Sequence, residues 1–236
     1  MINLKNISHS YDDKQVLDNL SLEIELNKLT CLLGGSGSGK TTILRIIAGL
    51  ENPQLGEVSI NSKVLTSNNN IIIPPNERKL GFIFQDLALW PHLSVFDNIA
   101  FGLIERKENN IKEKVYEILD YFNLKELSVK FPNQLSGGQK QLVAISRSLV
   151  LKPDVLLMDE PLNNLDVKLK RRILDYIKNL KHEFNLTIVY VTHDHKEAFA
   201  VSDKIVILDK GKIEEIGTIE QIKQSSNEFV NYFLEY

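Results

Sequence analysis

The stretch Gly34-Gly35-Ser36-Gly37-Ser38-Gly39-Lys40-Thr41 decides the fold of this chain. The apolar run Leu29–Leu33 before it predicts a strand, and the run Thr42–Leu50 after it predicts a helix. Glycines let backbone N–H groups turn inward around phosphate oxygens, and the dipole of a following helix favours the same negative charge. We expect Lys40 to reach the β- and γ-phosphates of a nucleotide, the Thr41 hydroxyl to hold Mg²⁺, and Thr42 to complete the binding loop. The alternative, a flexible Gly/Ser loop, does not account for the strand and helix that flank it.

Composition limits the classes of protein to consider. The chain has 236 residues, of which 43% are hydrophobic and 25% charged, enough for a core without disulfides. The net charge of −3 and the lack of a basic block argue against a nucleic-acid binder. The single cysteine, Cys31, lies in an apolar run, so we expect it in the core of a cytosolic protein. No apolar segment reaches the roughly 20 residues that span a bilayer, so any work at a membrane would go through a partner.

Three further apolar runs end in polar residues. Leu80–Phe84 ends at Gln85, Val155–Met158 at Asp159 and Glu160, and Ile188–Thr192 at His193. Strand-like runs alternate here with amphipathic helical ones, typical of a mostly parallel sheet, whose ligands bind at the carboxyl ends of its strands. We therefore expect these polar residues around one nucleotide, although each alone would be a weak signal and His193 alone favours a structural role.

The expected chemistry of this group is nucleotide hydrolysis. A carboxylate such as Asp159 suits Mg²⁺, directly or through water. Glu160 is placed to accept a proton from the water that attacks the γ-phosphate, once the backbone turns at the end of the strand. Gln85 is expected to orient water or contact the metal, and His193 to stabilise charge on the γ-phosphate.

Other segments predict secondary structure only. Leu20, Leu22, Ile24 and Leu26 alternate with polar residues as in a strand, and Asn61–Asn70 predicts a surface loop or the end of a hairpin. Helical faces are predicted by two sets of apolar residues: Ile111, Val115, Ile118, Leu119 and Phe122, and then Leu169, Ile173, Ile177 and Leu180.

A second diagnostic segment is Leu135-Ser136-Gly137-Gly138-Gln139. Its structural interpretation is a capping box, with Ser136 and Gln139 closing the start of a helix that carries Leu142, Ile145 and Leu149. Two glycines in a first turn are costly, up to about 1 kcal/mol each, unless the backbone must approach something closely. A helix N-terminus with a hydroxyl is also a phosphate-binding end, so we expect Ser136, Gly137, Gly138 and Gln139 to bind nucleotide.

The order of these motifs resembles the ATP-binding subunit of ABC transporters, and the resemblance covers essentially the whole chain. It implies an α/β P-loop NTPase (RecA-like) core with an N-terminal antiparallel β-subdomain and an inserted α-helical subdomain. One domain, 1–236, would divide into a core of 1–85 and 151–236 and a helical subdomain of 86–150. The resemblance also implies that two copies sandwich ATP head to tail, with Asn163-Asn164-Leu165-Asp166 crossing the interface. Tyr11 would stack on adenine, although an ordinary hairpin aromatic is the alternative.

Within the family, the segments Phe84–Val95 and Thr192–Ala198 resemble importer subunits for sugars, polyamines, iron or oxyanions. This implies a separate transmembrane permease, an extracytoplasmic solute-binding protein, and a location on the cytoplasmic face of the membrane. Leu89–His92 would lie where the permease docks, although Trp90 within it is more often a core residue. The transported solute is not encoded in this chain.

The chain also departs from the family pattern. Gly35 stands in place of a common Pro, Leu142 in place of the usual Arg, and His195 in place of a usual Gln, while Asn163-Asn164 replaces a Ser-Ala or Ser-Asn pair. None of these changes touches Lys40, Asp159, Glu160 or His193, so an active ATPase is expected.

The alternatives differ in what they would need. A DNA-repair ABC ATPase would carry a long coiled coil, a translation-type member two cassettes, and a nucleotide kinase would have no use for Ser136–Gln139. A binding module without hydrolysis is disfavoured by Glu160. The ATPase of an exporter remains the main alternative.

Overall fold

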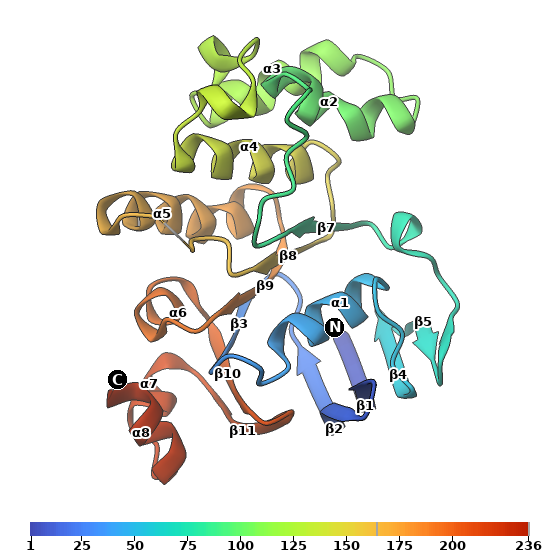
Figure 1. The fold of residues 1–236 in the computed structure, drawn as a ribbon, viewed down its shortest axis with the longest axis vertical. Helices are drawn as coiled ribbons and strands as arrows, with labels where there is room; N and C mark the ends of the chain where they lie inside the picture. Colours follow the sequence, from blue (N-terminus) through green and yellow to red (C-terminus); the bar gives the residue numbers. More distant parts are fainter. Residues whose placement is uncertain (164, 236) are drawn as a thin grey trace.

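The computed structural model describes residues 1–163 and 165–235. It contains two sheets (Figure 1). The first is antiparallel, in the order β2-β1-β4-β5-β6. Its strands are β1 (Ile2–Tyr11), β2 (Lys14–Ile24), β4 (Leu55–Ile60), β5 (Lys63–Ser67) and β6 (Asn70–Ile71).

The second sheet has the order β11-β10-β3-β9-β8-β7 and is parallel except for β11. Its strands are β3 (Leu29–Gly34), β7 (Leu80–Ile83), β8 (Val155–Asp159), β9 (Thr187–Thr192), β10 (Lys204–Asp209) and β11 (Lys212–Gly217). The central strands are buried along their whole length, as expected when helices cover both faces of a parallel sheet.

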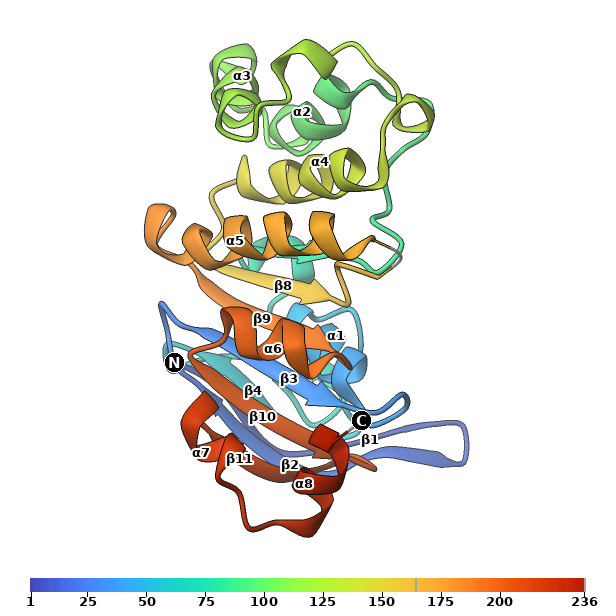
Figure 2. The same cartoon turned by 90° about the vertical axis from the view of Figure 1, so that its left-hand side faces the viewer.

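The helices are α1 (Lys40–Ala48), α2 (Val95–Glu105), α3 (Ile111–Tyr121), α4 (Gly137–Leu149), α5 (Val167–Glu183), α6 (His195–Val201), α7 (Ile219–Lys223) and α8 (Glu228–Glu235). Short 3₁₀ turns lie at Pro75–Glu77, Lys125–Leu127 and Pro132–Gln134. Helix α1 packs between the two sheets, whereas α5 covers the opposite face of the parallel sheet (Figure 2). Helices α2, α3 and α4 lie together at one end of the molecule (Figure 1). Within the described residues, no helix combines the length and the apolar character that crossing a membrane requires.

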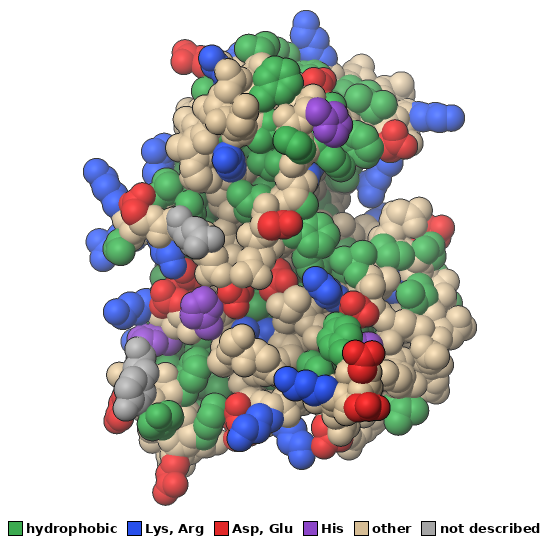
Figure 3. Space-filling model, in the orientation of Figure 1, with side chains coloured by type: hydrophobic (Ala, Val, Ile, Leu, Met, Phe, Trp, Pro, Cys, Tyr) green, Lys and Arg blue, Asp and Glu red, His purple; other side chains and the backbone are tan. Residues whose placement is uncertain are grey.

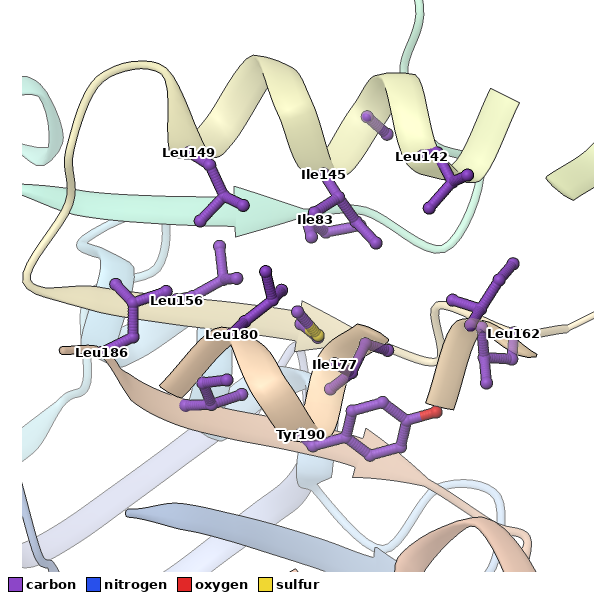
Figure 4. Close-up of a cluster of buried hydrophobic side chains, with 14 of the residues drawn as sticks. Ile83, Leu142, Ile145, Leu149, Leu156, Leu162, Ile177, Leu180, Leu186 and Tyr190 are labelled. Carbon is purple, nitrogen blue, oxygen red and sulfur yellow. The ribbon is translucent and has the colours of Figure 1, made fainter. Parts of the chain in front are cut away.

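The core that connects α4 and α5 to the sheet is shown in Figure 4. Ile145 and Leu149 of α4 pack with Ile83 of β7, and Ile177 and Leu180 of α5 lie between β8 and Tyr190 of β9. Leu142, where family members usually have Arg, is 8% exposed and belongs to the same cluster. The departure at this position therefore adds apolar surface to the core.

The predicted architecture is confirmed, with local differences. Cys31 is fully buried, as predicted. The alternating strand ends at Ile24, so Leu26 lies beyond it, and the strand before Gln85 ends at Ile83 rather than Phe84. Asn61–Asn70 is not only a loop, because β5 lies inside it with Leu65 and Thr66 buried. Asn61, Asn68 and Asn69 occupy the turns on either side, in left-handed conformations that Asn tolerates. The boundaries 86 and 150 of the helical part stay a prediction.

Candidate active site

The glycine loop joins β3 to α1, and its glycines are needed by the fold itself. A Cβ on Gly34 would lie 2.3 Å from the carbonyl oxygen of Leu208, which is too close for any side chain. Gly39, at the start of α1, has a φ of 101°, and a Cβ there would lie 2.7 Å from Leu17 Cδ2. No side chain caps the start of α1. The first N–H groups of the helix therefore face the loop without a local partner, as an anion-binding end requires.

Lys40 is folded back into this loop. Its side chain is 4% exposed, and Nζ donates hydrogen bonds to the carbonyl oxygens of Gly34 (2.9 Å) and Gly35 (2.7 Å) and to Ser38 Oγ (3.3 Å). Burial lowers the pKa of Lys40, while Glu160 and Asp159 oppose that shift. The ammonium group is thus held next to the loop, where phosphate oxygens would replace weaker carbonyl partners.

Thr41 and Asp159 form a hydrogen-bonded pair, because the Thr41 hydroxyl donates to Asp159 Oδ1 at 2.8 Å. Asp159 ends β8 and is 5% exposed. Burial raises its pKa, against the hydrogen bond from Thr41, which lowers it. A hydroxyl and a carboxylate side by side are hard oxygen ligands of the kind that Mg²⁺ prefers, so the residues present fit this ion. Elsewhere in the described chain, no group of three or more His, Cys, Asp or Glu side chains is arranged to hold a metal.

Glu160 sits on a turn directly after β8, as the sequence predicted. Its φ is 43°, a left-handed conformation that is uncommon for a residue with a side chain and costs about 1–3 kcal/mol. The turn is fixed by a hydrogen bond from the Glu160 N–H to the Val191 carbonyl oxygen at 3.0 Å. In a continuing strand the neighbouring carboxylates of Asp159 and Glu160 would point to opposite faces, so the turn redirects that of Glu160. Both carboxylates act on the ammonium group of Lys40.

The Glu160 carboxylate contacts two further side chains. His193 Nδ1 lies 3.3 Å from Oε1, and Asn163 Nδ2 donates a short hydrogen bond to Oε2. Glu160 is 18% exposed and His193 56% exposed, so the pair opens toward solvent. A carboxylate held by two neighbours and open on one side can accept a proton from a water molecule.

Two adjoining clefts share Ser36 and Glu160. A cleft of about 340 Å³ is lined by Tyr11, Lys14, Val16, Ser36, Gly37, Gly39, Lys40, Thr41, Thr42, Gln85 and Glu160. A larger one, of about 700 Å³, is lined by Gly35, Ser36, Glu160, His193, Asp194, His195, Lys196, Tyr232 and Phe233. The residues predicted from β1, the glycine loop and the ends of β7, β8 and β9 therefore meet in one region.

Tyr11 lies at the rim of the smaller cleft. Its side chain is 39% exposed, and its ring packs edge-on against His9, with centroids 4.8 Å apart and an interplanar angle of 87°. Tyr11 thus lines the same cleft as the glycine loop. Its function as an adenine-stacking residue stays a prediction.

The segment Ser136–Gln139 lines neither cleft. It forms the capping box: Ser136 Oγ accepts from the Gln139 N–H (3.4 Å), and Gln139 Oε1 accepts from the Ser136 N–H (2.9 Å). The two glycines let α4 approach its own chain closely. A Cβ on Gly137 would lie 2.9 Å from Leu165 Cδ2, and one on Gly138 would lie 2.6 Å from Leu169 Cδ1. Contact of this segment with a nucleotide stays a prediction. So does the bridging role of 163–166, of which Asn164 lies outside the described residues.

Sequence analysis missed two residues that hold the predicted docking segment. Arg147 of α4 donates to the carbonyl oxygens of Leu87 (2.8 Å) and Ala88 (2.6 Å), and its guanidinium lies 4.9 Å from the ring centre of Trp90. Asn98 is fully buried and bonds both the N–H and the carbonyl of Trp90. No local pattern marks Arg147, because its partners lie about 60 positions earlier in the chain. Trp90 is half-buried and packs on the exposed ring of Phe101.

Fold and site together define a P-loop nucleotide-binding cassette. The family model described as "ABC transporter" matches residues 17–163. The chain belongs to the ABC transporter family, as its motifs predicted.

Individual relatives agree with this assignment. The chain is 45% identical, over 95% of its length, to the spermidine/putrescine import ATP-binding protein PotA of Thermotoga maritima, and it spans 60% of that protein. It is 41% identical to the sulfate/thiosulfate import ATP-binding protein CysA of Bradyrhizobium diazoefficiens, over 99% of this chain and 68% of the relative. Identity is 42% to the Fe(3+) ions import ATP-binding protein FbpC of Photorhabdus laumondii, over 99% of this chain and 66% of the relative.

A solved structure shows the same fold. It is described as the dimeric structure of a post-hydrolysis state of the ATP-binding cassette MJ0796 bound to ADP and Pi. It matches with a TM-score of 0.82 and 33% identity, over 93% of this chain and 99% of that one.

Proposed function

We propose that this chain is the ATP-binding and ATP-hydrolysing subunit of an ABC importer. Glu160 is the observation that carries this proposal. Its carboxylate is held between His193 and Asn163 and faces the same cleft as Lys40 and Thr41. Such a carboxylate would have no function in a module that only binds nucleotide.

ATP would bind with its phosphates in the glycine loop. The N–H groups of residues 34–39 and the start of α1 would surround the phosphates, and Lys40 would exchange its carbonyl partners for β- and γ-phosphate oxygens. The adenine would stack on Tyr11 at the rim of the same cleft. Thr41, Asp159 and Gln85 would hold Mg²⁺, which neutralises negative charge on the phosphates when it is bound.

Hydrolysis would use the residues beyond β8 and β9. Glu160 would accept the proton of the attacking water, Gln85 would help to orient that water, and His193 would donate to the γ-phosphate as charge develops on it. The protein would act here by positioning and electrostatics, since the phosphoryl transfer needs little covalent chemistry from it.

A second copy of the chain would complete each site. The segment Ser136–Gln139 lies away from the clefts of its own chain, and the related cassette MJ0796 is described as dimeric. In a head-to-tail pair, Ser136 and the first turn of α4 from one copy would face the γ-phosphate held by the other. The residues of 163–166 would lie at the interface between copies.

The proposed transport partners are supported by the relatives, which are named as import ATP-binding proteins for spermidine/putrescine, sulfate/thiosulfate and Fe(3+) ions. This chain would work on the cytoplasmic face of the membrane, with a permease and a solute-binding protein outside. The segment Leu89–His92, braced by Arg147 and Asn98, would receive the permease. Co-purification with a solute-binding protein supports import, whereas its absence from a purified, active transporter would favour an exporter.

The test is steady-state hydrolysis of MgATP by the unaltered chain and by Glu160→Gln. The substitution removes a proton acceptor and keeps the size of the side chain, so the rate should fall by about 10²–10⁴, while ATP still binds. Equal rates for the two proteins would contradict the proposed role of Glu160, and failure of the unaltered chain to hydrolyse ATP would contradict the proposed function.

A further inference from the structure

Glu197 is a buried carboxylate that the proposed chemistry does not use. It lies in the first turn of α6, four positions after His193, and is 5% exposed. Its Oε2 accepts hydrogen bonds from the Tyr190 hydroxyl (2.9 Å) and from Thr192 Oγ1 (2.9 Å), and Lys170 Nζ lies 2.6 Å from Oε1. Three elements, β9, α6 and α5, are therefore joined at this one side chain.

Such a buried charge is costly to maintain unless its partners are fixed. Tyr190 is fully buried, and burial raises its pKa well above the ordinary value, with Glu197 adding to the shift. The Tyr190 hydroxyl therefore stays a donor. Charge-assisted bonds of this kind are shorter and stronger than neutral ones and fix the geometry of the groups they join.

The network holds the residues on both sides of His193. Thr192 Oγ1 donates to Glu197 and also accepts a hydrogen bond from the Asp194 N–H at 3.0 Å. Asp194 in turn caps α6 by accepting from the Lys196 N–H (2.8 Å) and the Glu197 N–H (3.4 Å). Hydrogen bonds thus fix the backbone on both sides of His193, at Thr192 and at Asp194.

The other end of the network is the start of α5. The Lys170 N–H donates to the Asp166 carbonyl oxygen at 2.9 Å, and the Asp166 side chain caps the helix by accepting from the Leu169 N–H at 3.0 Å. Asn163, a few positions earlier, bonds the Glu160 carboxylate. Glu160 is therefore held from two sides, through Asn163 before α5 and through His193, which Glu197 ties to α5.

We propose that Glu197 and Lys170 are positioning residues that place His193 against Glu160 and make this placement depend on the start of α5. The inference rests on the proposed function. It also links the proposed contact between copies at 163–166 to the pair Glu160 and His193. A shift of α5 would move Lys170, and with it Glu197, Thr192 and His193. The rate of hydrolysis in one site would then depend on the contact of α5 with the second copy, even if the second copy made no further contact with the nucleotide in that site.

The experiment compares Lys170→Met, which removes the charge, with Lys170→Arg, which keeps it. Lys170→Met should lower kcat roughly 10- to 100-fold, the scale expected when a distant change misplaces a reacting group. ATP affinity, measured with a fluorescent analogue, should not change, and Lys170→Arg should recover most of the rate. A matched control is Lys181→Met, also on α5, whose ammonium pairs with Asp203 away from the site. It should lower the melting temperature and leave kcat unchanged.

A second background separates positioning from general loss of structure. In a His193→Ala variant, Lys170→Met should have no further effect on kcat, because the group it positions is absent. The same loss of rate with and without His193, or an equal loss from Lys181→Met, would overturn the proposal. Unchanged turnover of Lys170→Met would refute this proposal alone, whereas a lack of turnover in the unaltered chain would refute the proposed function as well.

Discussion

Two helix N-termini in this chain were expected to bind phosphate, and the structure treats them differently. The start of α1 has no side-chain cap, and the buried ammonium of Lys40 lies beside it. The start of α4 is closed by its own capping box, and the clefts around the glycine loop do not include it. Acidic and basic side chains are interspersed over the face shown in Figure 3.

The difference is consistent with different functions for the two helix starts. The proposed anion site at α1 would form in the single chain, since no side chain of the described residues caps that helix start. The end at α4 is stable by itself, which suits a surface that meets phosphate only when a second copy brings it. The comparison therefore predicts that changes at α1 affect nucleotide binding directly, whereas changes at α4 affect what happens after binding.

The largest expected effect is on ATP affinity. Lys40→Ala removes the two charge-assisted hydrogen bonds proposed between Lys40 and the β- and γ-phosphates. Each is worth about 1.5–3 kcal/mol, so the Kd for ATP should rise roughly 10²–10⁴-fold. Ser136→Ala should leave the affinity of the single chain unchanged. Titration of a dilute sample with a fluorescent ATP analogue measures both. If Ser136→Ala weakened this first binding event as much as Lys40→Ala, the proposed difference between the two helix starts would be wrong.

Two glycines of the loop before α1 should differ in how much an added methyl group lowers stability. Gly34→Ala forces a Cβ against the Leu208 carbonyl, and overpacking of this kind costs about 1–3 kcal/mol or more. Gly35→Ala is the matched control, because no atom of the residues that the structure describes, apart from its chain neighbours, lies within 4 Å of the added Cβ. Chemical denaturation should show a large decrease in the free energy of unfolding for Gly34→Ala and almost no decrease for Gly35→Ala.

Gly137→Ala tests the corresponding position on α4. Among the described residues, the close atom to an added Cβ is the end of the flexible Leu165 side chain, which can move aside. We expect the free energy of unfolding to be retained and ATP turnover to fall, because the added methyl would stand between the two copies. Retained turnover would remove Gly137 from the interface.

Ser136→Ala should also have a modest effect on stability. Loss of an N-cap side chain costs about 0.5–2 kcal/mol, and here it removes the acceptor of the Gln139 N–H. Ser136→Thr, which keeps the hydroxyl, should restore most of that loss in a denaturation experiment. If both variants were as stable as the unaltered chain, the capping box would contribute nothing.

The strand-end residues could be found from the sequence because each polar residue directly follows an apolar run that predicts a strand. A buried strand followed by a polar residue marks both a point in the fold and an edge of the sheet, and at that edge the structure brings Thr41 to Asp159 and His193 to Glu160. Their catalytic roles stay predictions.

The residue that holds the predicted docking segment and the one proposed to position His193 were not found from the sequence. Arg147 and Lys170 each act on partners distant in sequence, and neither stands out from the many exposed basic residues of amphipathic helices. The strand within Asn61–Asn70 was hidden for a different reason: asparagines at its turns dominate the composition, while its two buried residues, Leu65 and Thr66, give too short an apolar signal.

The smallest expected effect is a dependence of stability on pH. Burial raises the pKa of Asp159 in the folded chain. The protonated form is therefore favoured by folding, and its contribution to stability is lost as pH rises from the ordinary aspartate pKa through the raised one. Asp159→Asn should remove this dependence and raise the melting temperature of the nucleotide-free chain at neutral pH, while ATP binding loses its response to Mg²⁺. A lower melting temperature for Asp159→Asn would show that ionised Asp159 stabilises the chain.

The most direct test of the central claim is the mass of Glu160→Gln in solution, measured by light scattering with MgATP and with MgADP. We expect a dimer with ATP and a single chain with ADP, and we expect that adding Ser136→Arg prevents the dimer without preventing ATP binding. A Glu160→Gln chain that binds ATP and stays single at high concentration, or a dimer that Ser136→Arg leaves intact, would contradict it.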